Sequence, residues 1–160
     1  MSDRSPLQMF VYSVHESEEQ AVLEVMEEEG LDLEWSDDDQ GTSALVLGRR
    51  YGIDETPIGS SRDLATALLQ RAPSAVFKLW QDPHYSTDGH FVAHVPGIGT
   101  YTTKCDSDGT PHTSVPDLIT QLANAPAGIT VHDWLAGPGT QVLGAAVLSA
   151  LKPYEKEQLP

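Results

Sequence analysis

The sequence predicts a single α+β domain over residues 1–160, built as a mostly antiparallel sheet with helices on one face. The first 80 residues alternate β-forming and amphipathic runs in the order strand, helix, strand, strand, helix, strand, which is the connectivity of a ferredoxin-like fold. A related series of strand, strand, helix, strand and helix follows. The length and the 39% of apolar residues suffice for one hydrophobic core.

In the first half, the predicted helices have recognisable ends. Ser17 and Gln20 form a capping box at the start of the first helix, and Gly30 ends it. The second helix starts at Ser60 or Ser61, either of which can cap it. Strands are expected at residues 7–14, 31–35, 43–51 and 75–80, a turn at 54–59, and helices at 17–29 and 60–71.

In the second half, the apolar runs predict further strands and two more helices. Pro116 is acceptable in the first turn of the third helix, and Leu118, Ile119 and Leu122 are predicted to face inward. The last helix is almost uncharged, so we predict that it is buried on most sides. Strands are expected at residues 90–95, 99–105 and 129–134, and helices at 114–125 and 141–151.

The chain also resembles itself at an offset of 54 residues. Residues 43–80 match residues 97–134, from a Thr-Pro pair through a capped helix to a strand that ends in tryptophan. The match aligns Trp80 with Trp134. We therefore predict an internal duplication in which the tryptophans are equivalent core anchors.

Acidic charge is concentrated near the N-terminus. Residues 1–40 contain 13 acidic residues and one basic residue, so they carry −12 of the formal net charge of −15. Adaptation to high salt would instead spread acidic residues over the whole surface. Glu27, Glu28 and Glu29 also occupy the last turn of the first helix, where the helix dipole disfavours negative charge. This choice indicates a functional acidic face; the open alternative is a solvated face that only keeps the protein soluble.

Composition excludes several classes of protein and partner. A negative field repels nucleic acid phosphates and anionic membranes, so we expect neither direct nucleic-acid binding nor membrane binding. No apolar run approaches the roughly 18 residues needed to span a bilayer, and the N-terminus lacks a basic segment followed by an apolar one, so we expect no secretory signal. The single cysteine, Cys105, allows no internal disulfide. We expect a soluble protein of the cytosol. Self-assembly through an exposed sheet edge or through the last helix is a further, open possibility.

The preferred function is that of a non-catalytic protein-interaction module. An acidic helix and the adjoining strand can occupy a groove that otherwise holds DNA or RNA phosphates, as an inhibitor, an immunity-type protein or a nucleic-acid mimic would. The expected partner is a basic protein surface, such as that of a nucleic-acid-binding protein. We assign no catalytic, cofactor-binding or metal-ligating residue and expect no cofactor. The predicted partner-binding residues are Glu24, Glu27, Glu28, Asp37, Asp38 and Asp39.

The alternative function is a small enzyme, or a phosphate- or nucleotide-binding protein, with its site in the second half. A turn that follows a predicted strand and opens a helix can hold a phosphate through its amides, but no lysine follows this one as in a P-loop. A cysteine beside a histidine base can act as a nucleophile. The candidate residues are His90, His94, Cys105, His132 and the turn at Gly137–Thr140.

The spacing disfavours a metal site. On one strand, His90 and His94 share a face but lie roughly 13 Å apart, too far for joint ligation without a bend. Residues 106–109 predict a hairpin turn rather than a calcium loop. The possible ligands considered are Asp82, His84, His90, His94 and Cys105.

Overall fold

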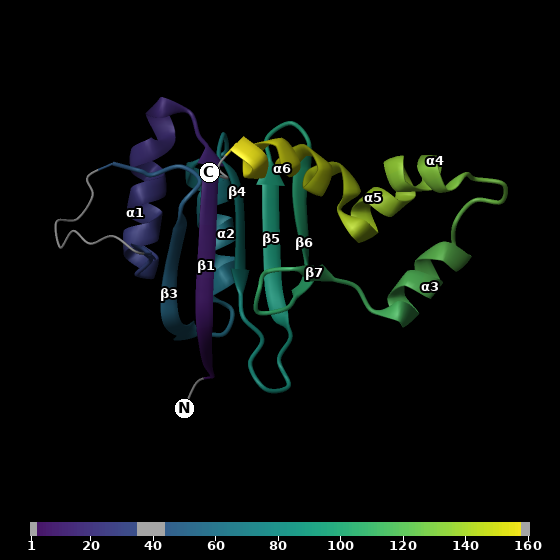
Figure 1. The fold of residues 1–160 in the computed structure, drawn as a ribbon, viewed down its shortest axis with the longest axis horizontal. Coiled ribbons are helices and arrows are strands. Elements are labelled where there is room, and N and C mark those ends of the chain that lie inside the picture. The colour runs from purple at the N-terminus through teal and green to yellow at the C-terminus, as the bar shows by residue number, and fades with distance from the viewer. Residues whose placement is uncertain (1–2, 35–43, 158–160) are drawn as a thin grey trace.

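The computed structural model describes residues 3–34 and 44–157, which form a seven-stranded antiparallel sheet and helices (Figure 1). The predicted α+β class and antiparallel sheet are confirmed. The spatial order of the strands is β2-β3-β1-β4-β5-β6-β7. The strands are β1 (Arg4–Ser13), β2 (Asp32–Leu33), β3 (Arg50–Pro57), β4 (Val76–Gln81), β5 (Gly89–Val95), β6 (Gly99–Cys105) and β7 (Pro111–His112). The helices are the 3₁₀ turn η1 (Glu16–Glu18), α1 (Glu19–Glu29), α2 (Ser60–Arg71), α3 (Val115–Ala123), α4 (Val131–Ala136), α5 (Pro138–Leu143) and α6 (Ala145–Glu157).

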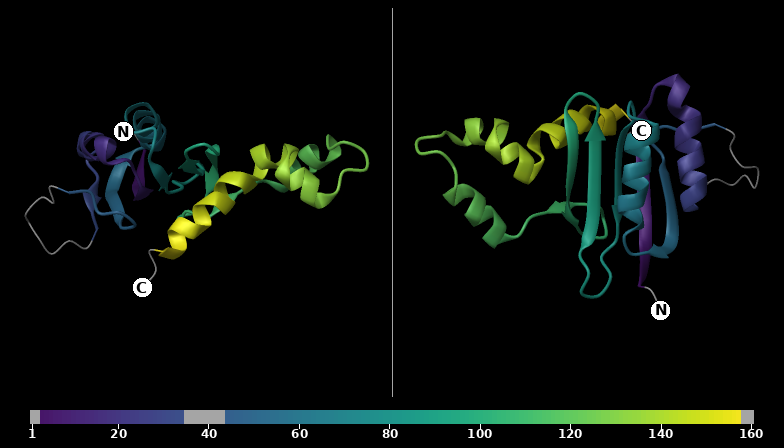
Figure 2. Two further views of the ribbon diagram at one scale, coloured as in Figure 1. Left: turned by 90° about the horizontal axis from the view of Figure 1, so that it is seen from above. Right: turned by 180° about the vertical axis from the view of Figure 1, so that it is seen from behind.

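The two faces of the sheet carry separate cores. Leu7, Met9 and Val11 of β1 face α1 and α2. Val147 and Leu151 of α6 pack on the opposite face, and the view from above in Figure 2 shows α6 on the other side of the sheet from α1 and α2. The prediction of helices on one face was therefore wrong. Strands β4 and β5 bury residues on both faces, so each face needs a cover.

The strand predicted at 43–51 lies later in the chain than expected. Residue 43 is outside the described residues, and the next six residues form loop and turns before β3 begins at Arg50. The turn predicted at 54–59 is also wrong in its first half, because β3 continues to Pro57, which pairs with Arg4 of β1. Pairing with the neighbouring strand overrides the local preference of these residues for a turn.

Helix α3 forms where the third helix was predicted. The Oγ atom of Ser114 accepts a hydrogen bond from the N–H of Asp117 at 3.1 Å and caps the helix. The inward-facing residues were predicted wrongly: Ile119 and Leu122 are 60% and 51% exposed, and Leu118 is only half-buried. Helix α3 lies beyond the sheet, so the sheet does not cover its apolar side (Figure 1).

Residues 115–143, which contain α3, α4 and α5, form an arm that extends past the β6–β7 edge of the sheet (Figures 1 and 2). The strand predicted at 129–134 was wrong, because α4 begins there. The Oγ1 atom of Thr130 accepts a hydrogen bond from the N–H of Asp133 at 3.1 Å, so this β-branched residue acts as a helix cap. Trp134 is buried against α5 instead of a sheet.

The helix predicted at 141–151 is divided between α5 and α6. Gly144 separates the two helices in a left-handed conformation, with φ of +60°. Helix α6 buries only Val147 and Leu151, so the prediction that the last helix is buried on most sides was wrong. In the described part of the chain the longest helix is α6, with 13 residues, and none is long and apolar enough to span a bilayer.

The two segments of the predicted repeat share only their first part. In both, a strand precedes a helix: β3 precedes α2, and β7 precedes α3. They then diverge, because Trp80 lies in a strand and Trp134 in a helix, so the two tryptophans are not equivalent anchors. The internal duplication and the ferredoxin-like relationship of the first half stay predictions.

Candidate functional site

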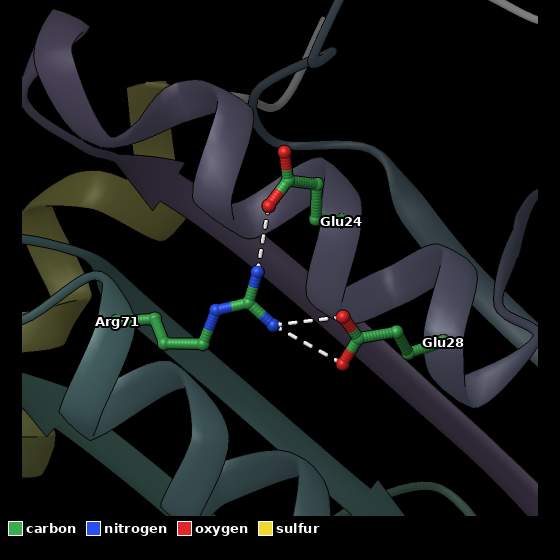
Figure 3. Close-up of polar contacts among 3 residues, drawn as sticks. All are labelled: Glu24, Glu28 and Arg71. Atoms are coloured by element: carbon green, nitrogen blue, oxygen red, sulfur yellow. Dashed lines mark hydrogen bonds and ion pairs between the residues drawn. The ribbon is translucent and has the colours of Figure 1, made fainter.

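Two of the predicted partner-binding carboxylates are engaged by an arginine of the same chain (Figure 3). Arg71, at the end of α2, donates to Glu24 Oε2 at 2.7 Å and to the two oxygens of Glu28 at 3.0 and 3.1 Å. The hydrogen bonds to Glu28 are the largest cause of a raised pKa of Arg71. Glu24 and Glu28 are four residues apart on α1, where two like charges destabilise a helix. Because Arg71 of α2 binds both, the pair instead stabilises the contact between α1 and α2.

Of the other predicted partner-binding residues, Glu27 lies in the described part of the chain. Glu27 is exposed in the last turn of α1. Asp37, Asp38 and Asp39 lie outside the described residues. The neighbouring Glu29 responds to the local field: burial contributes most to raising its pKa, and the nearby carboxylates raise it further. Four acidic residues, Glu24, Glu27, Glu28 and Glu29, thus lie near the end of α1, and Arg71 binds two of them.

Carboxylates gather in a groove at the β2–β3 edge of the sheet. The groove has a volume of about 650 Å³. Within the described residues, Glu34 is the one groove carboxylate that forms an ion pair, 3.6 Å from Arg50. We call Asp32, Glu34, Asp54 and Glu55 together the acidic groove. The full lining is Gly30, Asp32, Leu33, Glu34, Gly52, Ile53, Asp54 and Glu55.

Two glycines shape the acidic groove. Gly30 ends α1 with φ of +77° and turns the chain into β2. Gly52 faces Glu34: a Cβ atom at this position would lie 2.8 Å from Glu34 Oε1, so glycine leaves room for the carboxylate. Strand β2 pairs with β3 no further than Gly52. As far as the chain is described, the outer edge of β3 beyond this point has no strand partner.

Sequence reasoning missed Asp54 and Glu55 as part of the acidic surface. It placed them in a turn and counted acidic charge only to residue 40. The available signal was their position directly after a β-forming run, because Asp54 and Glu55 continue β3. Asp32 of β2 pairs with Gly52 of the same strand, β3. The antiparallel pairing brings acidic residues from two distant segments to one sheet edge.

The candidate residues of the second half do not form one site. His90 and His94 pair with different residues of β6, Lys104 and Thr100, at opposite ends of the strand pair. Cys105 belongs to the core on the α6 face. His132 is exposed on α4, in the arm. Within the described residues, no three histidine, cysteine or acidic side chains are placed to hold a metal ion.

The predicted phosphate turn also lacks the expected context. Gly137 joins two helices, α4 and α5, instead of a strand and a helix. The hydroxyl of Thr140, the last residue of this turn, donates to the carbonyl oxygen of Leu135 at 2.7 Å. Helix α5 has only six residues. This turn is therefore a connection within the arm.

His90 lies in a separate polar cavity of about 490 Å³ between β5, β6 and the start of α2. Its Nδ1 atom is 2.7 Å from the Oγ atom of Ser61, and its Nε2 atom is buried without a hydrogen-bond partner in the described chain. Burial, and to a smaller degree Arg62, lower the pKa of His90, which favours the neutral ring. Arg62, Lys104 and several threonines line the same cavity.

Cys105 should behave as a structural thiol. It is 5% exposed, its Sγ atom lies 3.8 Å from the carbonyl oxygen of Gln81, and burial is the main cause that raises its pKa to about 12. We expect a thiol reagent at pH 8 to label native protein at least about 100-fold more slowly than the unfolded chain, because the thiolate is the reactive form. Stopped labelling with and without denaturant, read by mass spectrometry, measures both rates. Equal rates would contradict this prediction.

Comparison of the chain with protein-family models, with curated proteins and with solved structures finds no match. The arrangement of the side chains is therefore the evidence on function. The acidic groove combines four carboxylates with an open strand edge, an arrangement that attracts cationic groups and offers backbone hydrogen bonds to an extended segment.

Proposed function

We propose that this protein is a non-catalytic interaction module that binds a basic protein partner through the acidic groove. The observation that carries the proposal is the gathering of four carboxylates in one groove, along the stretch of β3 whose outer edge has no strand partner within the described residues. Glu27 adds an exposed carboxylate in the last turn of α1, three residues before Gly30. The proposed site is thus centred on the sheet edge, whereas the predicted partner-binding residues lie on α1 and at 37–39.

The carboxylates of the acidic groove are better placed to receive a partner than those bound by Arg71. A lysine or arginine that approached Glu24 or Glu28 would compete with the guanidinium of Arg71, which already offsets part of their charge. Asp32, Asp54 and Glu55 are exposed. Because one exposed ion pair contributes only about 0–1 kcal/mol, binding requires several pairs at once, and the groove supplies them.

The proposed partner is a protein whose basic surface otherwise contacts nucleic acid phosphates. Such a surface matches a row of carboxylates in charge, so the module would act as an inhibitor, an immunity-type protein or a nucleic-acid mimic. Charge of this kind mainly accelerates association and selects the partner. Binding should therefore weaken steeply as salt is added, because the Debye length falls from about 10 Å at 0.1 M to about 3 Å at 1 M.

Neutralising the acidic groove is expected to abolish capture of a basic partner. The variant replaces Asp32→Asn, Glu34→Gln, Asp54→Asn and Glu55→Gln. Its affinity for a fluorescent arginine-rich peptide, measured by anisotropy at low and high salt, should fall at least about tenfold at low salt. Loss of four charges at scattered exposed positions should have a smaller effect, since those carboxylates do not share one groove.

A matched control distinguishes the effect of the acidic groove on binding from the effect of net charge. It removes the same four charges from exposed positions elsewhere, through Asp108→Asn, Asp117→Asn, Asp133→Asn and Glu157→Gln. Equal loss of affinity in the control and in the groove variant would reduce the proposal to a general charge effect. Unchanged binding by the groove variant would refute it.

A second candidate function is binding of a small polar ligand in the His90 cavity. The unpartnered Nε2 atom of His90 favours this candidate, since a buried ring nitrogen ordinarily has a hydrogen-bond partner. A thermal-shift screen against inorganic phosphate and nucleotides tests it. Stabilisation that disappears in a His90→Phe variant would support ligand binding at this cavity.

A further inference from the structure

Exposed apolar side chains are concentrated on the arm. Eight large apolar side chains are exposed in the described part of the chain, and five of them belong to α3 and α4. Single exposed apolar residues are ordinary, whereas a contiguous group indicates an interaction surface. Three of the five lie on α3, and we call these the apolar stripe: Val115, Ile119 and Leu122.

The apolar stripe forms one helical face. Val115, Ile119 and Leu122 are spaced by four and three residues, which places them on the same side of the helix. They are 67%, 60% and 51% exposed, and no residue of α3 is buried. The helix is capped by Ser114 and strongly amphipathic, yet its apolar side has no cover within the described chain.

The charge of the arm restricts what can cover this face. No lysine or arginine occurs between Lys104 and Lys152, and the arm holds only two acidic residues, Asp117 and Asp133. Helices that bind membrane surfaces carry lysine and arginine on their polar side, so the arm does not resemble one. A strongly basic partner would be drawn to the acidic groove, not to this nearly uncharged segment.

The position of the arm favours a second copy of this chain. Figures 1 and 2 show the arm at one end of the long axis and α1 at the other, with the sheet between them. Two copies that meet through their arms keep their acidic ends far apart, well beyond the Debye length of about 8 Å at physiological salt. Contact through any acidic surface would instead bring like charges together.

We infer that the protein forms a symmetric dimer in which the apolar stripes of two copies cover each other. A two-fold axis lets α3 pack antiparallel against α3 of the second copy, because the same face is presented by both. Ile119, in the middle of the stripe on α3, then lies closest to the axis. The dimer holds one acidic groove at each end and can bind two basic partners.

The first test is the oligomeric state of the full chain by sedimentation equilibrium. We expect a dimer at roughly 50 μM, and a rise of at least about tenfold in the dissociation constant for Ile119→Glu, which places a charge in the centre of the contact. Gln121→Glu is the matched control, since it adds the same charge to the same helix at an exposed polar position. Unchanged circular dichroism would show that both variants fold.

A second test locates the contact by cross-linking. The single native thiol, Cys105, is buried, so an Ile119→Cys variant has one accessible thiol. Mild oxidation should give a disulfide-linked dimer of Ile119→Cys but not of Gln121→Cys. Monomeric wild-type protein at roughly 50 μM, equal weakening by both glutamate variants, or equal cross-linking at both positions would overturn the inference. Binding of monomer to neutral phospholipid vesicles, lost in Ile119→Glu, would also overturn it and assign the stripe to a lipid surface.

Discussion

Replacing Gln81 with leucine is expected to destabilise the fold by about 3 kcal/mol, because four hydrogen bonds of a buried amide disappear together. Gln81 is 3% exposed at the end of β4. Its Oε1 atom accepts from the N–H groups of Gly59 and Ser61 at 3.2 and 3.4 Å, at the start of α2. Its Nε2 atom donates to the carbonyl oxygens of Thr56 and Pro57 at 3.3 and 3.0 Å, at the end of β3. Leucine fills the same space but leaves buried polar groups without partners.

The control for this change is Gln70→Leu, which makes the same substitution at an exposed position of α2. We expect Gln70→Leu to alter the free energy of unfolding by no more than about 0.5 kcal/mol. Denaturant unfolding followed by circular dichroism gives both values by linear extrapolation. A loss below about 1 kcal/mol for Gln81→Leu would mean that water satisfies the exposed groups and that the amide does not join β3 to α2.

Helix ends were predictable because the cap chemistry is local. Gly30 ends α1 in the left-handed conformation expected of a glycine cap, and Ser114 caps α3 with its hydroxyl group. The caps predicted for the starts of α1 and α2 were wrong. Ser17 lies in a 3₁₀ turn that His15 caps, and the N-cap residues of α1 and α2 are Glu18 and Gly59, neither of which forms a side-chain cap hydrogen bond. Strands β1, β4, β5 and β6 were also found close to their predicted ranges, because each is a run of β-forming residues bounded by polar turns.

The errors arose where distant contacts decide the structure. Asp54 and Glu55 belong to β3 because β1 pairs with this strand as its neighbour, and nothing local distinguishes them from a turn. Thr130 favours a strand by composition but caps α4 through its hydroxyl group. The exposure of Ile119 depends on the path of the arm, which a helical pattern does not specify. An apolar helical face predicts a contact, and its partner can be another molecule.

The candidate site was predictable only in its overall charge. The excess of acid in residues 1–40 drew attention to α1 and β2, and Asp32 and Glu34 from this segment line the acidic groove. The sequence did not reveal that Arg71, more than 40 residues after Glu24 and Glu28, binds both of them. It also gave no indication that Asp54 and Asp32, which are far apart along the chain, line one groove. An acidic surface depends on which charges the fold brings together and which it pairs, and both are tertiary properties.

Alanine at Gly144 is expected to destabilise the protein by about 3 kcal/mol, because it combines backbone strain with a steric clash. Gly144 has φ of +60° between α5 and α6, where a side chain is disfavoured. A Cβ atom would overlap the ring of Tyr101 of β6. That ring cannot easily withdraw, because its hydroxyl group donates to the carbonyl oxygen of Val142 at 2.9 Å. The clash should therefore separate α6 from the sheet.

Gly97→Ala separates the two causes, because Gly97 has a similar φ of +81° but a Cβ atom there would meet no other atom within 4 Å. Strain alone should cost about 1 kcal/mol, so the difference between the two variants measures the clash with Tyr101. Denaturant unfolding gives both free energies, and hydrogen exchange should show earlier opening of α6 than of β1 only in Gly144→Ala. Equal destabilisation by the two alanines would mean that α6 moves away from Tyr101 at little cost in free energy. The arm would then be loosely attached to the sheet, since Gly144 is where the chain returns from it.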